Sequence, residues 1–287
     1  MMLTIDTKKI STSKLHAYLL SAISPRPIAF ASTIDADGKS NLSPFSFFNV
    51  FSANPPILIF SPARRVRDNS IKHTLENVYQ VKEVVINVVN YTMAQQMSLA
   101  STEYAKGINE FEKAGFTMLK SDLVKPFRVA ESPVQFECKV NEIMALGTEG
   151  GAGNLIISEV LKIHISRAIL DKNDRIDQEK LDLISRAGGS YYSRAKKGFF
   201  EIPKPLTSMG IGVDQIPTDI KNSDILTGNN LGMLANVDCT PHQQDVNNFA
   251  KDNPKYIGLE IQEKHKFAQE FLEKNDVISA WKVLLIK

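Results

Sequence analysis

The segment Ser24–Ser61 constrains the fold more than any other part of the chain. It reads SPRPIAFASTIDADGKSNLSPFSFFNVFSANPPILIFS. The apolar run Pro27–Ile34 ends in DADG at positions 35–38, which is typical of a tight turn, and a second extended stretch follows. Ile57–Phe60 is typical of a further short, buried strand. We therefore expect strand, turn, strand, loop and strand.

The rest of the chain up to about residue 197 also favours strands over helices. Glu83–Val89 is β-branched, and Pro133–Leu146 and Leu155–Ile165 are long enough to pair through a glycine-rich hairpin. Helical patterns are expected at residues 12–23, from Asn69 or Ser70 to about Tyr79, and at 91–114 with Gly107 interrupting. Together these predict a mainly β fold with inserted helices, as a closed or split antiparallel barrel.

The composition changes after Tyr192. Residues 198–257 are rich in Pro, Gly, Asn and Asp, residues 259–275 carry a charged helical pattern, and Val277–Ile286 is apolar. We interpret residues 198–287 as a C-terminal extension packed on a barrel domain of residues 1–197, rather than as an independent domain.

Composition excludes several classes of protein. The 287 residues are 43% hydrophobic and 23% charged, the balance of an ordinary globular chain, and a net charge of +2 gives no basic field for nucleic acid. No run approaches the ~20 apolar residues of a membrane span, and the N-terminus lacks a signal-peptide pattern. The two cysteines, Cys138 and Cys239, lie far apart, which favours a reducing, cytoplasmic location.

The run SPFSFFN at Ser43–Asn49 combines aromatic and polar side chains. Neighbouring side chains of a strand alternate between its two faces, so we expect Phe45 and Phe47 to face one way and Ser46 and Phe48 the other. Such a run could be a core strand with incidental serines. It could also cover a planar ring, with apolar walls on the ring face and hydroxyl and backbone groups on its polar edge.

A second group of polar residues suits a phosphate monoester, which binds cations, hydroxyl groups and helix N-terminal amides. Ser61 ends a strand, and Lys72 and Thr74 lie near the start of a helix, so one anion could bridge them. The arginine-rich loop of residues 62–67 is typical of a solvated surface. The full candidate set is Arg26, Ser61, Arg64, Arg65, Arg67, Lys72 and Thr74.

Other motifs give little chemistry by themselves. Gly150–Asn154 is followed by a strand rather than a helix, so we expect a hairpin and not a dinucleotide-binding loop. The five histidines have no metal-like spacing, and no Ser-His-Asp arrangement is evident, so we predict no metal site and assign no catalytic residue. Gly188–Tyr192 could be a turn with packed aromatics or could stack on a ligand.

The ordered set of these segments resembles the flavin reductase-like, FMN-binding split-barrel family, including its flavoredoxin-type branch. The similarity rests on PRPIAFAST, DADGK, NLSPFSFFN, SANPP, KHT at positions 72–74 and SRAGGSYYSR at positions 185–194, and covers roughly residues 10–195. The family has Lys-Asp-Thr where this chain has KHT, so His73 replaces an acidic residue.

The resemblance implies an FMN-binding oxidoreductase, with FMN preferred over FAD and NAD(P)H as a transient reductant. It implies NAD(P)H-dependent flavin reduction, or flavin-mediated electron transfer to a small-molecule or protein acceptor, in a homodimer. It implies that the backbone of Ser46–Asn49 lines the isoalloxazine ring and that four other residues matching the family pattern bind the phosphate. The cofactor-binding residues expected on this basis, with Arg64 as a weaker candidate, are Arg26, Ser43, Ser46, Phe47, Phe48, Asn49, Ser61, Arg64, Lys72 and Thr74.

Two other functions stay open on the sequence. The chain could be a flavoprotein oxygenase or oxidase that acts on a small molecule. It could instead be a non-catalytic module that holds flavin or haem. A C-terminal extension that covers the flavin would favour a dedicated protein partner.

Overall fold

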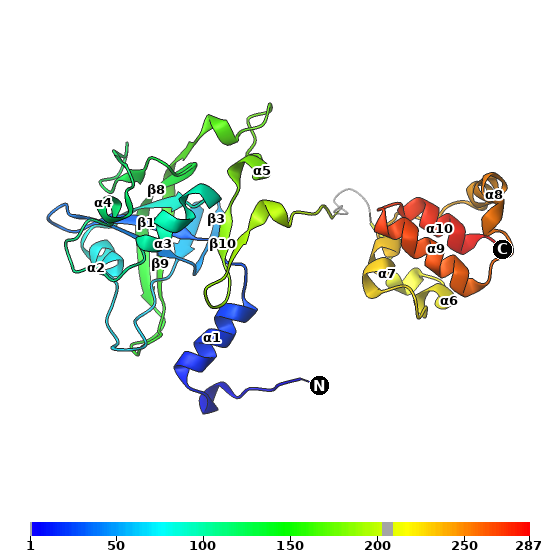
Figure 1. Cartoon of the computed structure of the whole chain (residues 1–287), viewed down its shortest axis with the longest axis horizontal. Coiled ribbons are helices and arrows are strands. Elements are labelled where there is room, and N and C mark those ends of the chain that lie inside the picture. Colours follow the sequence, from blue (N-terminus) through cyan, green and yellow to red (C-terminus); the bar gives the residue numbers. More distant parts are fainter. Residues whose placement is uncertain (1, 203–208) are drawn as a thin grey trace. The chain divides into compact units, whose positions relative to one another are not determined.

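The computed structural model describes residues 2–202 and 209–287 (Figure 1). The chain divides into two compact units, Met1–Phe199 and Phe200–Lys287. We call them the barrel unit and the helical unit and describe each by itself. The extension expected at residues 198–287 includes residues 203–208, which lie outside the described residues.

The barrel unit is built on one antiparallel sheet of seven strands, in the order β2-β1-β5-β8-β9-β4-β3. Its two edge strands, β2 and β3, are consecutive in the chain and only Ser46 and Phe47 join them. The sheet must therefore curl until its edges approach each other, which makes a split barrel and confirms the predicted fold class. The strands are β1 (Ala29–Ile34), β2 (Ser40–Phe45), β3 (Phe48–Ala53), β4 (Pro56–Phe60), β5 (Glu83–Val88), β8 (Val134–Ala145) and β9 (Asn154–Ile165).

The expected turn between β1 and β2 is confirmed. Gly38 has φ +81°, a conformation that only glycine adopts without strain, and the Asp35 carboxylate accepts hydrogen bonds from the N–H groups of Asp37 and Lys39. Every residue of β1 is buried because both faces of this strand are covered. This hairpin fixes the register that carries β2 toward its bend at Ser46.

One strand does not run through SPFSFFN, so the predicted alternation across that run is wrong. The backbone bends at Ser46 and Phe47 between β2 and β3, and strict alternation holds only within a continuous strand. Phe45 is 8% exposed and packs in the core, whereas Phe47 is 38% exposed and meets the edge of the His16 ring.

The helices of the barrel unit are short. The helix expected over residues 91–114 is divided, and Gly107 lies in the connecting loop with φ +85°. Helix α2 begins at His73 rather than after Asn69, because Asn69 is left-handed (φ 57°) and its side chain holds Arg64 and Thr148. The helices are α1 (Thr12–Ala22), α2 (His73–Gln80), α3 (Ala94–Leu99), α4 (Glu110–Ala114) and α5 (Gln178–Leu181).

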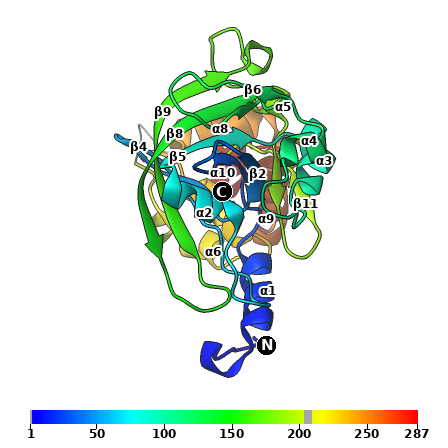
Figure 2. The ribbon, with the colours of Figure 1, turned by 90° about the vertical axis from the view of Figure 1, so that its left-hand side faces the viewer.

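Two hydrophobic clusters stabilise the curled sheet from its two faces. One joins Phe30 and Leu42 to Met97 and Phe111 of α3 and α4, and the other joins Phe60 and further strand residues to α2. Each fully buried side chain of this size contributes roughly 1.5–3 kcal/mol. Figure 2 shows the long β8–β9 pair on one side of the barrel, and α3 and α4 on the other.

The hairpin expected at Gly150–Asn154 is confirmed and connects β8 to β9. A Cβ at Gly150 would lie 3.0 Å from the carbonyl oxygen of Arg65, so glycine permits this close approach. Backbone hydrogen bonds from Arg64 to Ala152 and from Gly151 to Arg64 then tie the hairpin to the arginine-rich loop. The short strands are β6 (Met118–Leu119), β7 (Arg128–Val129), β10 (Ile184–Arg186) and β11 (Tyr192–Arg194).

The helical unit has its own hydrophobic core around Trp281, which is fully buried and donates its indole N–H to the Leu234 carbonyl at 2.9 Å. The helix expected at residues 259–275 is confirmed, and the apolar run after it is also helical. The helices are α6 (Thr218–Lys221), α7 (Gly228–Ala235), α8 (Gln243–Asp252), α9 (Ile261–Glu273) and α10 (Val277–Leu285). That this unit packs on the barrel stays a prediction. Within the described ranges, no helix has the length and apolar character needed to cross a membrane.

Candidate functional site

A polar hollow lies where β2 meets the start of α2. It is narrow, about 20 Å³, which is room for little more than one water molecule, so an anionic group could be held at its opening but a ring system could not enter. We call it the phosphate hollow. Its lining consists of Asn41, Ser43, Arg65, Lys72, His73, Thr74, Ser101, Thr102, Glu103, Tyr104 and Glu110.

The start of α2 supplies hydrogen-bond donors to the phosphate hollow. The first N–H groups of a helix have no partner inside the helix and carry partial positive charge. Thr74 is 1% exposed and its hydroxyl accepts a hydrogen bond from Asn41 at 2.8 Å. The Thr74 hydroxyl proton is therefore left to donate to an anion.

Lys72 is the cation of this hollow that has no counter-ion within ion-pair distance among the described residues, although the charge of Glu103 acts on it from further away. Among the residues that the structure describes, its ammonium group makes neither an ion pair nor a hydrogen bond. Burial, and then the nearby charge of Arg65, lower the pKa of Lys72. A half-buried cation without a close counter-ion is costly, and a bound anion would reduce that cost.

Arg65 and Glu110 frame the hollow and are already engaged. Arg65 donates to Glu103 at 2.9 Å, to the Ser70 hydroxyl at 2.8 Å and to the Ile71 carbonyl at 2.9 Å. Glu110 is 5% exposed; burial raises its pKa, which the hydrogen bond from the Leu42 N–H partly opposes. The positive charge left for a ligand is therefore mainly that of Lys72.

A second, larger hollow of about 170 Å³ opens at the other end of β2, and we call it the ring hollow. Its walls are about equally apolar and polar, and the polar part includes the Ser46 and Ser101 hydroxyls and one guanidinium. The lining residues are Ile28, Pro44, Phe45, Ser46, Met97, Ser101, Arg186 and Tyr192.

The two hollows lie along one strand. Both are lined by Ser101, and the β2 residues Asn41 and Ser43 of one are followed by Pro44 and Phe45 of the other. Four residue steps of extended strand cover about 13 Å at roughly 3.3 Å per residue. An elongated ligand with an anionic end and a planar end could therefore lie along β2.

Of the residues predicted to bind cofactor, the structure brings Ser43, Lys72 and Thr74 to the phosphate hollow and Ser46 to the ring hollow. Arg26 is 6% exposed and does not line either hollow. Its guanidinium donates to the carbonyls of Leu20, Ile23 and Ala187 and, at 3.4 Å, to Ser46. Arg26 thus helps to position Ser46 without lining the hollow itself.

Two other predicted phosphate ligands, Ser61 and Arg64, do not line either hollow. Ser61 follows β4, and Arg64 lies in the arginine-rich loop of residues 62–67. The Ser61 hydroxyl accepts from the Asn154 N–H at 3.0 Å and so joins β4 to the hairpin. Arg64 donates to the Asn69 side chain at 2.6 Å and to the Asn69 carbonyl at 2.9 Å. Both side chains brace the loop that carries Arg65.

The three residues after Ser46 are also outside both linings. Phe47 is partly exposed, Phe48 packs against the barrel core, and Asn49 is exposed on β3. The side chains of these three residues are therefore not candidates for contact with a ring. Backbone atoms of the bend stay candidates, because Ser46, which lines the ring hollow, lies at the same bend. The resemblance implied a role for this backbone, which stays a prediction.

Several lining residues were not predicted. Sequence reasoning dismissed Arg65 as solvated, although its neighbour Arg64 was kept, because a loop has no periodicity that tells which arginine points inward. Ser101–Tyr104 follow α3 and reach the hollow only through packing. Of the Gly188–Tyr192 element, Tyr192 lines the ring hollow, opposite Arg186 on β10.

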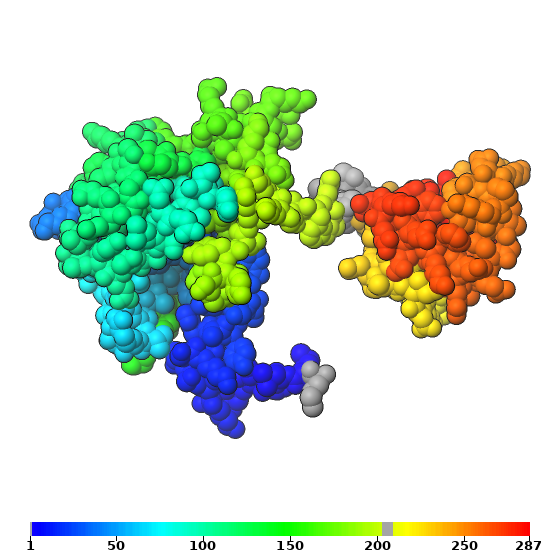
Figure 3. Space-filling view, in the orientation of Figure 1, coloured from blue at the N-terminus to red at the C-terminus, as the bar shows by residue number. Residues whose placement is uncertain are grey.

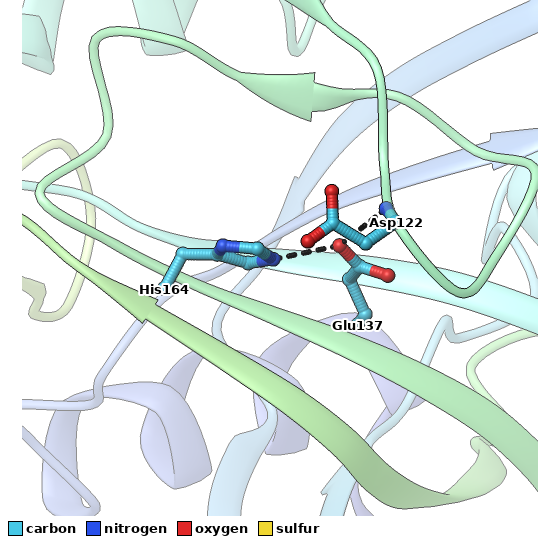
Figure 4. A group of neighbouring side chains, drawn as sticks. All are labelled: Asp122, Glu137 and His164. Atoms are coloured by element: carbon cyan, nitrogen blue, oxygen red, sulfur yellow. Dashed lines mark hydrogen bonds and ion pairs between the residues drawn. The ribbon is translucent and has the colours of Figure 1, made fainter.

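A further charged group, which we call the Glu137 network, lies away from these hollows (Figure 4). Asp122, Glu137 and His164 have ligand atoms within 4.8 Å of one another, a spacing that a metal ion could use. However, Lys162 lies 2.5 Å from Asp122, and the Arg128 guanidinium lies 3.8 Å from both carboxylates. These two cations already neutralise the acidic charge, so the group is better explained as structural.

Glu137 is fully buried and anchors the loop at Asp122 and Leu123. Its carboxylate accepts from their N–H groups at 2.9 and 2.6 Å and bonds His164 Nε2 at 2.7 Å. Burial alone would raise the pKa of Glu137, but these hydrogen bonds outweigh it and lower that pKa. His164 is thus a partner in this network.

Comparison with known proteins gives the family. The model described as "Flavin reductase like domain" matches residues 21–180, more than half of the chain. An uncharacterized protein of Aquifex aeolicus is 39% identical over 188 residues, which cover 66% of this chain and 93% of that protein. The chain belongs to the flavin reductase-like family, as the resemblance implied.

Solved structures share the barrel. Component B of nitrilotriacetate monooxygenase from Bacillus cereus is 27% identical, with a TM-score of 0.66, over 70% of this chain and 99% of that one. Flavoredoxin of Desulfovibrio vulgaris shares the fold at 16% identity and a TM-score of 0.56, over 72% of this chain and 98% of that one. These relatives leave more than a quarter of the present chain unmatched.

Proposed function

We propose that this protein binds FMN along β2 and acts as a flavin-dependent oxidoreductase, reduced by NAD(P)H or passing electrons from the flavin to an acceptor. The observation that carries the proposal is the Lys72 ammonium, which has no hydrogen bond or close ion pair among the described residues, in a narrow polar hollow that lies along β2 from a larger, partly apolar hollow. Family membership supports flavin binding, and the names of the two structural relatives denote redox proteins.

The residues fit FMN group by group. Lys72, the Thr74 hydroxyl and the first N–H groups of α2 would hold the phosphate, which carries nearly two negative charges at neutral pH. Pro44, Phe45 and Met97 would cover the ring, and Ser46, held by Arg26, would bond its polar edge. The bound flavin supplies hydride or electron transfer, and the protein positions it and excludes water. FMN is preferred over FAD because the phosphate hollow, at about 20 Å³, has no room for the additional nucleotide of FAD.

Titration with FMN and with riboflavin tests the cofactor assignment. The protein should bind FMN at least about tenfold more tightly than riboflavin, because a charge-assisted contact to phosphate contributes roughly 1.5–3 kcal/mol. Bleaching of the bound flavin by NADH or NADPH would establish the reductase activity. Equal affinity for the two flavins would contradict the phosphate assignment.

Oxygen consumption and turnover separate this proposal from its two rivals. An oxidase or oxygenase would consume oxygen with a small-molecule substrate and no added acceptor. A storage module would bind flavin tightly and show no turnover with either nicotinamide cofactor.

We also propose a homodimer, formed through the free edge of the sheet. The edge strand β3 exposes Val50 and Phe51, each 63% exposed, and an unpaired apolar edge favours pairing with a second copy. The N-terminal segment, in blue in Figure 3, stands out from the barrel body, and α1 buries no residue. A monomeric mass by light scattering at micromolar concentration would contradict this. A cytoplasmic location stays a prediction, with which the two free cysteines agree.

A further inference from the structure

Arg186 lines the ring hollow from the β10–β11 hairpin. It pairs across this hairpin with Tyr192, and both residues belong to the wall of the hollow. The Arg186 guanidinium stacks on the Tyr192 ring, 4.6 Å from its centroid. This stacking keeps the guanidinium at the wall of the hollow that we assign to the flavin ring.

The backbone around Arg186 is fixed by two contacts. Arg186 and Arg26 exchange backbone hydrogen bonds, each of 2.8 Å, which tie β10 to the segment before β1. At the turn of the hairpin, a Cβ on Gly188 would lie 3.0 Å from the Cα of Ser21, so glycine lets the turn approach α1 closely. The fold therefore places Arg186, and a ligand would meet a preformed position.

The formal charge on the described lining of the ring hollow is positive. Among the described residues of that lining, Arg186 alone is charged at neutral pH. Within residues 2–202 and 209–287, its guanidinium makes no ion pair and donates no hydrogen bond. Arg194 of the same hairpin differs, because its guanidinium bonds both oxygens of Asp182, at 2.8 and 2.6 Å. The charge of Arg186 is therefore available to a ligand.

Arg26 strengthens the positive field at this wall. Its guanidinium donates to backbone carbonyl oxygens and to the Ser46 hydroxyl, which are groups without a full negative charge. Burial, and then the charge of Arg186, lower the pKa of Arg26, so the two guanidinium groups lie close enough to repel each other. A negative charge in the ring hollow would relieve this repulsion.

Reduction changes the charge of a flavin ring. The oxidised isoalloxazine is neutral, whereas the reduced ring can lose a proton from N1 and then carries one negative charge. A preorganised cation stabilises the charged form relative to the neutral form, because it needs no rearrangement to meet the charge. A site that binds the reduced flavin about tenfold more tightly than the oxidised flavin raises the two-electron reduction potential by about 30 mV.

We propose that Arg186 makes the ring hollow bind the reduced, anionic flavin more tightly than the oxidised flavin, so that the protein keeps its flavin after reduction. The inference rests on the proposed function, because it requires FMN in the ring hollow. A nicotinamide donor gives up one hydride, that is, two electrons and a proton, and the same two electrons reduce the acceptor. We therefore expect the acceptor to come to the protein, and not reduced flavin to leave for a second enzyme.

Equilibration of the FMN-loaded full chain with a redox dye of known potential tests the proposal. In the wild type, bound FMN should have a potential at least about 30 mV above that of free FMN in the same buffer, which is about a tenfold preference for the reduced form. Arg186→Gln should remove most of this difference and weaken the binding of oxidised FMN far less. Arg186→Lys, which keeps the charge, should retain most of it.

Arg194→Gln is the matched control. It removes an equal charge from the same hairpin, where Asp182 already neutralises Arg194 and Lys196 stays 3.2 Å from Asp182. The potential of this variant should differ from that of the wild type by less than about 10 mV, roughly a twofold change in relative affinity. Equal shifts in Arg186→Gln and Arg194→Gln would overturn the proposal. A wild-type potential at or below that of free FMN would overturn it without any variant.

Anaerobic ultrafiltration measures the retention of flavin directly. After reduction with dithionite, less flavin should pass the filter than before reduction in the wild type, and Arg186→Gln should abolish this difference. A greater loss of flavin from the reduced wild type would contradict the proposal.

The dye and dithionite need no nicotinamide cofactor, so the two proposals can fail separately. If FMN binds but its potential does not depend on Arg186, the inference about Arg186 fails alone. If the potential depends on Arg186 but neither NADH nor NADPH reduces the bound FMN, the inference stands and the NAD(P)H-dependent activity fails. If FMN binds in neither redox state, both proposals fail.

Discussion

The phosphate hollow and the Glu137 network both contain charged side chains of the barrel unit, yet they differ in whether each charge has a hydrogen-bond or ion-pair partner. In the Glu137 network, each buried charge has its partner, and the carboxylate accepts from two N–H groups and one histidine. In the phosphate hollow, Lys72 is half-buried, and among the described residues its ammonium group makes no hydrogen bond or close ion pair and feels only the more distant charge of Glu103. A network in which every buried charge has a partner stabilises the fold. A group in which one cation lacks a close anion is suited to bind an anionic ligand.

The largest expected effect breaks the complete network. Glu137→Ala should lower the free energy of unfolding by about 3 kcal/mol, because two loop N–H groups and His164 lose their hydrogen-bond partner and Arg128 loses an ion pair. Urea denaturation would measure this loss. Glu142→Ala, an exposed glutamate on the same strand, is the control and should cost less than about 0.5 kcal/mol. Equal losses at the two positions would remove the distinction.

The pH dependence of stability sharpens this result. The pKa of Glu137 is lowered in the folded protein, so its carboxylate stabilises the fold above the unfolded value of about 4.3. That stability is lost as the pH falls through the lowered pKa. The difference in stability between the wild type and Glu137→Gln should therefore shrink below about pH 4. A constant difference down to pH 2 would contradict it.

The next largest effect is expected when the Lys72 ammonium group is removed from the phosphate hollow. Lys72→Ala should weaken FMN binding by at least about tenfold and leave the unfolding free energy unchanged or slightly higher, since an unpaired buried cation is removed. Riboflavin, which lacks the phosphate, is the matched ligand and should bind both proteins alike. If the two flavins lose affinity equally, Lys72 does not meet the phosphate.

Alkaline pH should weaken FMN binding, as Lys72→Ala does. The pKa of Lys72 is lowered by burial and by Arg65, and the phosphate needs the protonated ammonium. FMN affinity should therefore fall at a pH below the usual lysine value of about 10.4, by up to about tenfold. Riboflavin affinity measured over the same pH range serves as the reference. An FMN affinity that stays flat up to pH 10 would count against the contact.

The smallest effect is expected at Arg64, which neighbours Arg65 in sequence but braces Asn69. Arg64→Gln should change FMN affinity less than about twofold, because its guanidinium does not line the hollow. Fluorescence titration would measure it. A loss of FMN affinity as large as that of Lys72→Ala would show that Arg64 also binds the phosphate. It would contradict the view that only the cation without a close partner binds the ligand.

The sequence predicts the strands better than the site. β-branched runs and turn residues locate β1, β5, β8 and β9 because these signals are local. The start of α2 was placed too early, since Asn69 reads as a cap but is bonded to Arg64 and left-handed. Arg186 and Ser101 reach the site only through tertiary packing, so no local pattern identifies them.

The separation of hydrophobic clusters in the described chain has a consequence for how such proteins change over time. Each cluster lies wholly within the barrel unit or wholly within the helical unit. A gene that gains or loses the segment after Phe199 would therefore leave each described barrel cluster with its full set of residues. The Aquifex relative agrees, since its match to 66% of this chain takes up 93% of its own length. The helical unit can be acquired as a module whose sequence drifts under its own constraints.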